Sequence, residues 1–407
     1  MKTTPFPKFL LIAAIAVHGT LTQAAPGTFG IAEANNAFAI NLYRHLASEQ
    51  GNLVVSPFSI DTALTMTYAG ARGNTARQMA KVLHYKSGDA DIHAEYANFL
   101  GGREGLNEGG NRFLVANSLW AQTGFPWLKP FQDLLRNDYK SLLMQIDLTG
   151  WPNFNPAIAA AARKTINQWA ANHTAGKIRE VLPDYLPDRD TRLILVNAVY
   201  FKGLWARPFD KEKTREATFH VSQTNFVSVQ MMHVDGRFRH FQDDNVEALQ
   251  LPYVSNRLSM TIILPRKGHS LEEIEEEMTV SQIERWCRDG DPTNVVVSVP
   301  RFTETTGFEL KGPLKAMGMK DAFDPVLADF SGITTAESLY VEAAIHKAYL
   351  RVDETGTEAA ATTAVVVVSS AELAVAFVAD HPFIYLIRDN LSGAIFFMGR
   401  VVDPSKE

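Results

Sequence analysis

The residue types able to do chemistry are present in this chain, but their spacing matches no common catalytic or metal-binding pattern. The 407 residues include eleven histidines and one cysteine. There is no G-x-S-x-G, H-E-x-x-H, G-x-G-x-x-G or Walker sequence, and no histidine has a metal-site spacing to Cys or to a carboxylate. His233 and His240 are seven positions apart in strand-like sequence and are expected on opposite faces. We therefore expect neither a metal nor a cofactor, and an exported hydrolase with a dispersed triad is the enzymatic alternative.

The most informative segment is 353–370, near the C-terminus. Seven of the eight residues from Thr357 to Ala364 are Ala or Thr, and the four valines Val365–Val368 follow. Small residues fit almost any surroundings, β-branched residues favour strands, and the segment has no proline to prevent pairing. The composition predicts a strand that has no obvious place in a finished sheet. A linker or an ordinary strand is the alternative.

The N-terminus has the three-part pattern of a secretory signal peptide. Two lysines precede the apolar run Phe9–Val17, and small residues follow. We predict a signal peptide over residues 1–24, with cleavage after Ala24 or Ala25, and a secreted or periplasmic protein. A membrane anchor is the alternative, but the apolar run is too short to span a bilayer.

Composition and charge are those of an ordinary globular protein. Hydrophobic residues make up 46% and charged residues 21%, and the formal net charge is -6. This mildly acidic balance argues against a nucleic-acid partner, and we expect no membrane partner either. The single cysteine, Cys287, excludes an intramolecular disulfide and is expected to be a buried small hydrophobe; a reactive thiol is the alternative.

Helical periodicity leads and strand alternation follows. Helices are predicted at 32–50, from Ser56-Pro57, from Asn74 to about Leu83, at 92–100 and at 156–172, and strands at 193–201, 226–232, 246–251, 258–264 and 295–302. Two short helices with capping boxes at Ser270/Glu273 and Thr279/Gln282 interrupt the strands, and the acidic run Glu272–Glu277 is expected to be a solvated helix face. This order, without a repeat, predicts one α+β domain over 25–407.

Several motifs in order along the chain resemble one protein family. They are Glu354–Ala361, Asn52–Ile60, Asn197–Trp205 with Pro208-Phe209, Asp329–Ile333 with Ile345–Lys347, and Asp380–Phe383 with Phe397–Arg400. Together they resemble the serpins, over essentially the whole mature chain. The resemblance implies the serpin fold, in which helices pack around a large mixed β-sheet with two further sheets. It also implies an exposed reactive-centre loop at about 354–380.

The resemblance implies a protease inhibitor and not an enzyme. In serpins a serine protease attacks the exposed loop and forms an acyl-enzyme. The loop then inserts into the sheet as a new strand and leaves the protease covalently trapped. The implied hinge comprises Glu354, Gly356, Thr357, Glu358, Ala359, Ala360, Ala361, Thr362 and Thr363. In the family's register Thr357, Ala359, Ala361, Thr363, Val365 and Val367 enter the core, and none is charged or large.

The resemblance also implies two supporting sites. Ser56, Ser59, Asn197 and His346 match the serpin shutter, a buried hydrogen-bond cluster below the sheet centre. The alternative is that Ser56 is an N-cap and His346 an ordinary strand residue. At the breach, Trp205 matches the family's tryptophan, and Arg301 is expected to pair with Glu354, a pair worth about 1 kcal/mol if it is exposed.

Family spacing places the cleaved bond at Ser370-Ala371, with Ser369-Ser370 as the runner-up. A small residue after valines suits an elastase-like or subtilisin-like protease. A non-inhibitory carrier or chaperone is the alternative function. We expect a monomer with a polymerisation risk, because Val365–Val368 can pair with a neighbour's sheet. We expect no heparin site, because 87–110 carries Asp89, Asp91, Glu95, Glu104 and Glu108.

Overall fold

The computed structural model describes residues 28–48, 51–86, 92–102, 106, 107, 109–141, 143–335, 339–357 and 374–406. The predicted signal peptide lies outside these residues. Most of the predicted hinge also lies outside them, namely Glu358, Ala359, Ala360, Ala361, Thr362 and Thr363. The residues of the two candidate cleavage sites, Ser369, Ser370 and Ala371, lie outside them as well.

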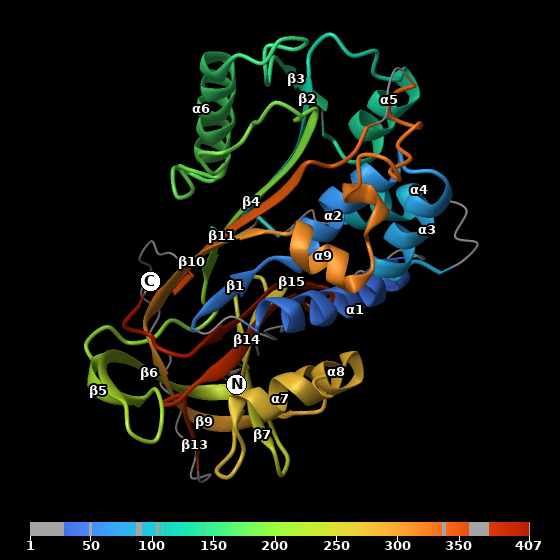
Figure 1. Ribbon diagram of the computed structural model, residues 1–407. Helices are drawn as coiled ribbons and strands as arrows, with labels where there is room; N and C mark the ends of the chain where they lie inside the picture. The colour runs from blue at the N-terminus through green and yellow to red at the C-terminus, as the bar shows by residue number, and fades with distance from the viewer. Residues whose placement is uncertain are drawn as a thin grey trace, which may run out of the picture.

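The helices divide into three groups around two sheets. The helices α1 (Thr28–Leu46), α2 (Pro57–Tyr68), α3 (Gly73–Val82), α4 (Ile92–Gly101), α5 (Lys129–Asp138) and α9 (Lys311–Met317), with the short 3₁₀ turn η1 (Asp321–Phe323), gather on one side in Figure 1. Helix α6 (Pro156–His173) lies alone on the opposite side of strands β2 and β4. Helices α7 (Leu271–Glu277) and α8 (Val280–Arg288) pack beside the second sheet.

The first sheet has six strands in the order β10–β11–β12–β4–β2–β3. Their bounds are Phe302–Glu309, Ala343–Asp353, Gly356–Thr357, Leu193–Leu204, Arg112–Gln122 and Leu143–Ile146. Strands β11 and β4 run parallel and pair directly from Ala343 opposite Ile194 to Tyr349 opposite Tyr200. Beyond that point the two-residue strand β12 lies between them. We call the direct pairing of β4 with β11 the seam.

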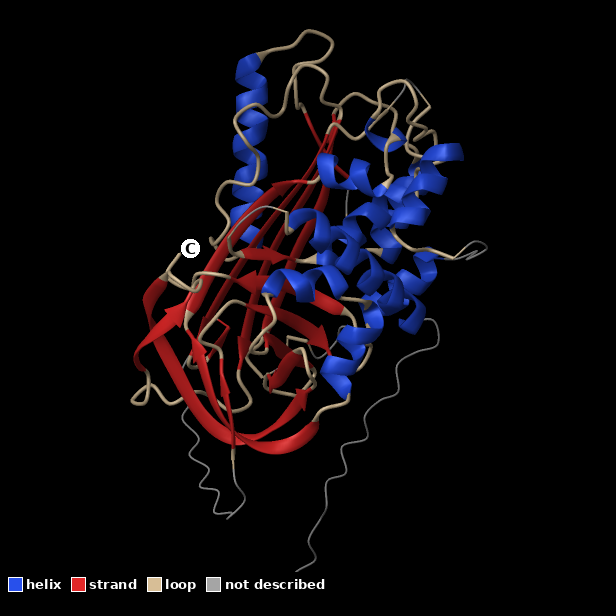
Figure 2. Ribbon diagram, turned by 60° about the horizontal axis from the view of Figure 1, so that its bottom comes forward, coloured by secondary structure: helices blue, strands red, loops and turns tan. Residues whose placement is uncertain are grey.

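The second sheet has nine strands, in the order β1–β15–β14–β8–β7–β6–β9–β13, with β5 paired to β6. Their bounds are Leu53–Val55, Ile395–Val401, Phe383–Asp389, Leu258–Pro265, Val246–Pro252, Phe226–Gln242, Asp291–Pro300, Val375–Val378 and, for β5, Arg215–His220. The long strand β6 pairs first with β5 and later with β7, so it joins the two further sheets of the sequence prediction into one. Figure 2 shows that the nine-stranded sheet is strongly curved at the end of the molecule away from α6.

Two buried clusters stabilise this arrangement. The larger lies among α1, α2 and both sheets, and the smaller lies between α6 and the strands β2, β4 and β11. Helix α2 is buried on all faces from Pro57 to Thr67, and the Ser56 hydroxyl accepts from Ser59 N at 3.4 Å as its N-cap. The smaller cluster includes Trp120 on β2, packed edge-to-face on Trp169 of α6, so α6 is fixed over the sheet.

Most predicted elements are confirmed, and three details change. The Ser270/Glu273 capping box is present, but at Thr279 only the side-chain cap from Gln282 N forms. The acidic run is not wholly solvated, because Glu275 is 7% exposed and bonded to Tyr43 and Arg400. Helical periodicity turns this one carboxylate inward. Strand 295–302 proves to be two strands, β9 and β10, separated at Arg301. Cys287 is buried, as predicted.

Candidate functional site

The predicted hinge begins inside the six-stranded sheet. Thr357 pairs with Val352 of β11 on one side and with Gly203 of β4 on the other, and Gly356 lies between Asp353 and Leu204. The expectation that residues 354–357 lie in an exposed loop is wrong, because all four are buried. They are buried because β11 and β4 diverge beyond Tyr349 and leave room for one more strand.

Glycine is required at the point where the chain turns back into the sheet. Gly356 has φ +153°, and a Cβ there would lie 1.9 Å from the carbonyl oxygen of Gly203. A Cβ on Gly203 would in turn lie within 2.6 Å of the rings of Phe201 and Tyr253. Two facing glycines therefore let the returning chain approach β4 closely enough to pair with it.

The side chain of Thr357 is fully buried and makes a specific polar contact. Its hydroxyl lies 2.8 Å from the Tyr253 hydroxyl, and either oxygen is able to donate. The Tyr253 ring stacks on Trp205 at 4.5 Å between centroids with 12° between planes. Burial raises the pKa of Tyr253, so its phenol stays neutral. Trp205 Nε1 donates to the carbonyl of Asp353 at 3.0 Å, which ties this aromatic pair to the end of β11.

Glu354 is held by one cation and one hydroxyl. Arg301 Nε donates to its Oε1 at 2.7 Å, a second bond comes from Arg301 Nη2, and the Thr214 hydroxyl donates to the same oxygen at 2.6 Å. Burial disfavours the carboxylate, but these bonds outweigh it and the pKa of Glu354 is lowered. The predicted pair is present, and it is exposed on one side only, since the side chain of Glu354 is 3% exposed and that of Arg301 is 44% exposed.

The four predicted shutter residues lie together behind the seam. Ser56 N donates to His346 Nε2 at 3.2 Å, and His346 Nδ1 faces Asn197 Oδ1 in a close hydrogen bond. Asn197 Nδ2 then donates to Ser59 Oγ at 2.5 Å. These contacts require the tautomer with the proton on Nδ1. Burial lowers the pKa of His346 to about 3, so the imidazole is neutral.

Asn117 completes this cluster and was not predicted. Its Oδ1 accepts from Ser59 Oγ at 2.9 Å and from Asn197, and its Nδ2 donates to the carbonyl of Ser59 at 3.0 Å. The cluster, Ser56, Ser59, Asn117, Asn197 and His346, thus links α2 to strands β2, β4 and β11. We call it the shutter cluster. All its groups are neutral, so strands can separate there without parting opposite charges.

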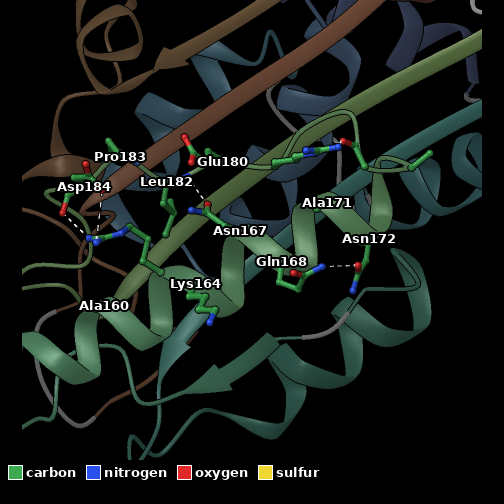
Figure 3. A pocket seen from close by; sticks show the side chains of 14 residues that line it. Ala160, Lys164, Asn167, Gln168, Ala171, Asn172, Glu180, Leu182, Pro183 and Asp184 are labelled. Carbon is green, nitrogen blue, oxygen red and sulfur yellow. Dashed lines mark hydrogen bonds and ion pairs between the residues drawn. The ribbon is translucent and has the colours of Figure 1, made fainter.

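The return segment 174–186, which follows α6, covers the seam from the side opposite the shutter cluster. Lys347 Nζ of β11 donates to the carbonyl of Glu180 at 2.7 Å, and Lys177 lies 5.2 Å from the ring centre of Tyr349. In Figure 3, Asn167 of α6 faces this segment, and its Oδ1 accepts from Leu182 N at 2.9 Å. A groove of about 840 Å³ separates the segment from α6. A strand entering the seam would separate β4 from β11 beneath this cover.

The arrangement is suited to strand insertion. At one end of the sheet, Gly356 and Thr357 lie between β4 and β11 and pair antiparallel to both strands. Over the rest of their length β4 and β11 pair directly with each other, in parallel. The described residues contain no cluster of three His, Cys, Asp or Glu able to hold a metal ion. Within the same residues, no helix combines the length and the apolar character needed to cross a membrane.

Tyr253, Thr214 and Asn117 are the site residues that the sequence analysis missed. Tyr253 lies two positions after the predicted strand 246–251, and a Tyr beside a Pro at a strand end is a weak signal for a fixed position. Asn117 lies in a strand, 112–122, that was not predicted. Its residues are buried on both faces toward the C-terminal end, so the alternation that marks a strand is lost. Thr214 carries no sequence signal.

Comparison with known proteins gives one consistent result. The profile of the Serpin family, described as serine protease inhibitors, matches residues 33–404. An uncharacterized serpin-like protein of Thermococcus kodakarensis is 38% identical over 380 residues, which cover 92% of this chain and 86% of that protein. The leukocyte elastase inhibitor of Homo sapiens is 35% identical over 387 residues, covering 92% and 99%.

Solved structures agree with the sequence matches. The thermophilic serpin tengpin in its native state has a TM-score of 0.83 at 26% identity, covering 92% of this chain and 94% of that one. Human thyroxine-binding globulin complexed with thyroxine has a TM-score of 0.83 at 29% identity, covering 93% and 100%.

Proposed function

This chain belongs to the serpin family, and on that premise we propose that it is an irreversible suicide-substrate inhibitor of a serine protease outside the cytoplasm. The protease serine attacks the loop and forms an acyl-enzyme with release of the downstream peptide. The loop then enters the seam as a new strand, carries the protease along, and leaves the ester trapped. No residue of this chain acts as a catalyst in that sequence.

One observation carries the proposal: β12 occupies the start of the path that the loop must follow. Gly356 and Thr357 are already paired antiparallel to both β4 and β11, which is the orientation of the complete inserted strand. Continuing the insertion places small or β-branched, uncharged side chains on the buried face, at little desolvation cost. Each new residue gains backbone bonds worth about 1 kcal/mol net. Insertion is therefore downhill once the seam opens.

The target we propose is an elastase-like or subtilisin-like protease that cleaves at Ser370-Ala371, with Ser369-Ser370 as the neighbouring choice. The support is the small side chain after a run of valines, and the absence of Arg or Lys from 355–373. Relatives named leukocyte elastase inhibitor in Homo sapiens and Xenopus laevis, each 35% identical, are consistent with that choice.

We also propose export of the chain, with residues 1–24 removed and residues 25–407 acting as one domain. The support is the basic, apolar and small-residue pattern of the N-terminus. The mature protein is then a monomer whose partner is the target protease, and it works outside the reducing cytoplasm without a disulfide.

The alternative function is that of a non-inhibitory carrier. A similar structure, thyroxine-binding globulin, is recorded in complex with thyroxine. The alternate residues from Thr357 to Val367 that would become buried on insertion are all uncharged, so no charge has to be desolvated. This composition favours inhibition over the carrier function.

The test is to mix the mature protein with pancreatic elastase and with subtilisin, each in turn, and to separate the products on denaturing gels. We expect a band at the summed mass that survives boiling in detergent, and a released C-terminal peptide whose mass places the bond. Thrombin and trypsin are the matched controls, since the proposed site lacks their basic residue.

Two further results would change the conclusion. Cleavage near Ser370 without a covalent band, together with a large gain in heat stability, would show insertion without trapping. Cleavage without that gain would remove the insertion mechanism and favour the carrier.

A further inference from the structure

A buried charged cluster lies where α7 meets strands β10, β14 and β15. Arg400 Nη1 donates to both carboxylate oxygens of Glu275, at 3.1 and 3.0 Å, and Tyr43 of α1 donates to Glu275 Oε1 at 2.6 Å. Arg400 Nε also donates to the carbonyl of Gly51 at 2.9 Å. One carboxylate is thus matched by one guanidinium.

A second carboxyl in the same cluster has no such match. Glu304 of β10 is 1% exposed, and its Oε2 accepts a close hydrogen bond from the Tyr385 hydroxyl. Its Oε1 has no hydrogen-bond partner within the described part of the chain. A buried polar atom without a partner costs roughly 1–3 kcal/mol, so a vacant acceptor at this depth calls for a donor.

Both carboxyls line one cavity that opens to solvent. It measures about 840 Å³, and its charged lining residues are Glu272, Glu275, Glu304, Arg400, Asp403 and Lys406. Acidic groups outnumber basic ones there by four to two. Glu272 is exposed at the rim, whereas Glu275, Glu304 and Arg400 are buried in the wall.

We propose that this cavity binds a small organic cation that carries a primary ammonium or guanidinium group, with one N–H donating to Glu304 Oε1. The choice of a cation over an anion follows from the local charges. Arg400 already faces Glu275, so Glu304, once ionised, is the carboxylate without a hydrogen-bonded cation among the described residues. A charge-assisted bond to Glu304 would supply both the missing donor and the missing positive charge.

Ligand binding is coupled to loss of a proton from Glu304. Burial raises the pKa of Glu304 above its ordinary value, more than the Tyr385 bond and the Arg400 charge lower it. The groups that face it are Tyr385 from β14, Arg400 from β15, Tyr43 from α1 and Glu275 from α7. The raised pKa favours the protonated acid while the cavity is empty. An arriving R–NH₃⁺ converts it to the carboxylate, and the proton passes to the buffer.

Calorimetry of the mature protein with agmatine tests this directly, because agmatine carries both an ammonium and a guanidinium group. Titrations at pH 7 in phosphate and in HEPES, whose ionisation enthalpies differ and neither of which carries a primary ammonium group, count the protons released. We expect saturable binding with release of up to about one proton per site. The variant Glu304→Gln should bind roughly tenfold or more weakly and release none. Glu272→Gln, at the rim, should change affinity by less than about threefold.

Three results would overturn the proposal. These are equal agmatine affinity of Glu304→Gln and the parent, binding without proton release, and saturable binding of acetate in place of agmatine. If Glu304→Gln fails to fold, Tyr385→Phe takes its place, because it keeps the carboxyl. That variant should still bind agmatine with proton release, and failure to do so would equally overturn the assignment. None of these outcomes depends on whether the chain inhibits a protease.

Discussion

The two ends of one path through the six-stranded sheet differ in what holds them. At the breach end β4 and β11 are apart, and Thr357 already lies between them, with its hydroxyl in contact with that of Tyr253. At the shutter end β4 and β11 are paired directly, and His346 and Asn197 on these strands bond to each other and to α2. Under the proposed mechanism, insertion would begin at the breach end and would be restrained at the shutter end by a neutral hydrogen-bond cluster.

The difference suggests separate duties for the two ends. Under the proposed mechanism, the breach end would select what enters, because the first side chain must fit a buried site beside Trp205 and Tyr253. The shutter end sets how readily the strands part, because its bonds must be exchanged when the new strand arrives. At the rim of the breach the structure holds a charged pair, Arg301 with Glu354, in which the Arg301 side chain is half-exposed. Within the described residues of the shutter cluster every group is uncharged.

The largest expected effect is that of Thr357→Arg, which would break the selection at the breach. A guanidinium placed beside Tyr253 must lose its hydration without a partner, at a cost of several kcal/mol. We expect the ratio of covalent complex to cleaved inhibitor to fall by roughly a hundredfold or more, as several kcal/mol dictates. Titration of the protease with the variant, followed on denaturing gels, gives this ratio. Thr357→Val, uncharged and of similar size, should retain most of the inhibition. An Arg variant as effective as the parent would refute the account of the hinge.

The second prediction concerns a buried acid on the helix that carries the shutter serines. Asp61 of α2 accepts from the Tyr96 hydroxyl at 2.8 Å, and its Oδ1 has no partner among the described residues. Burial raises the pKa of Asp61 to about 7. Between pH 3.8 and about 7 the unfolded chain ionises this group and the folded chain does not. Stability from Asp61 is therefore complete below pH 3.8 and is lost as the pH rises to about 7.

The titration of His346 changes the stability in the opposite direction over nearly the same pH range. Its pKa falls from 6.5 to about 3 on folding, so stability is complete above pH 6.5 and is lost as the pH falls toward 3. The two slopes, each at most about 1.4 kcal/mol per pH unit, should largely cancel in the parent between pH 4 and 6.5. Asp61→Asn should expose the rising slope of His346. Urea unfolding at half-unit pH steps should give a gain over the parent that grows to about 4 kcal/mol at pH 7. A pH-independent difference would show that Asp61 is not buried as a neutral acid.

The third prediction weakens the shutter cluster itself. Asn197→Ala removes the acceptor of His346 and the donor to Ser59, and should lower the free energy of unfolding by about 2 kcal/mol. We also expect polymers or a latent form at a lower temperature than in the parent, seen by gel filtration of heated samples. Asn172→Ala, at an exposed position on α6, is the control and should behave as the parent does. Unchanged heating behaviour of Asn197→Ala would mean that the cluster does not restrain the seam.

The shutter and breach residues could be named from the sequence because their motifs are local and ordered along the chain. What the sequence could not give depended on partners far away. Glu275 belongs to an acidic run that is typical of a solvated face, and only Arg400, 125 positions later, explains its burial. Residues 354–357 were expected in a loop because their burial depends on the distance between β4 and β11, which local composition does not encode.

The smallest expected effect belongs to the Arg301–Glu354 pair at the rim of the breach. Arg301→Ala leaves Glu354 with the Thr214 hydroxyl alone and should cost about 1 kcal/mol, since solvent screens the half-exposed guanidinium. The pair lowers the pKa of Glu354, so its contribution is present above pH 4.5 and fades as the pH falls further. Urea unfolding of the parent and the variant at pH 7 and pH 3.5 measures the cost of the substitution and its decrease at low pH. Arg301→Lys should recover part of the loss, because a lysine cannot form the two-nitrogen contact. A cost well above that of Asn197→Ala would reverse the comparison and make the breach, not the shutter, the main restraint on the sheet.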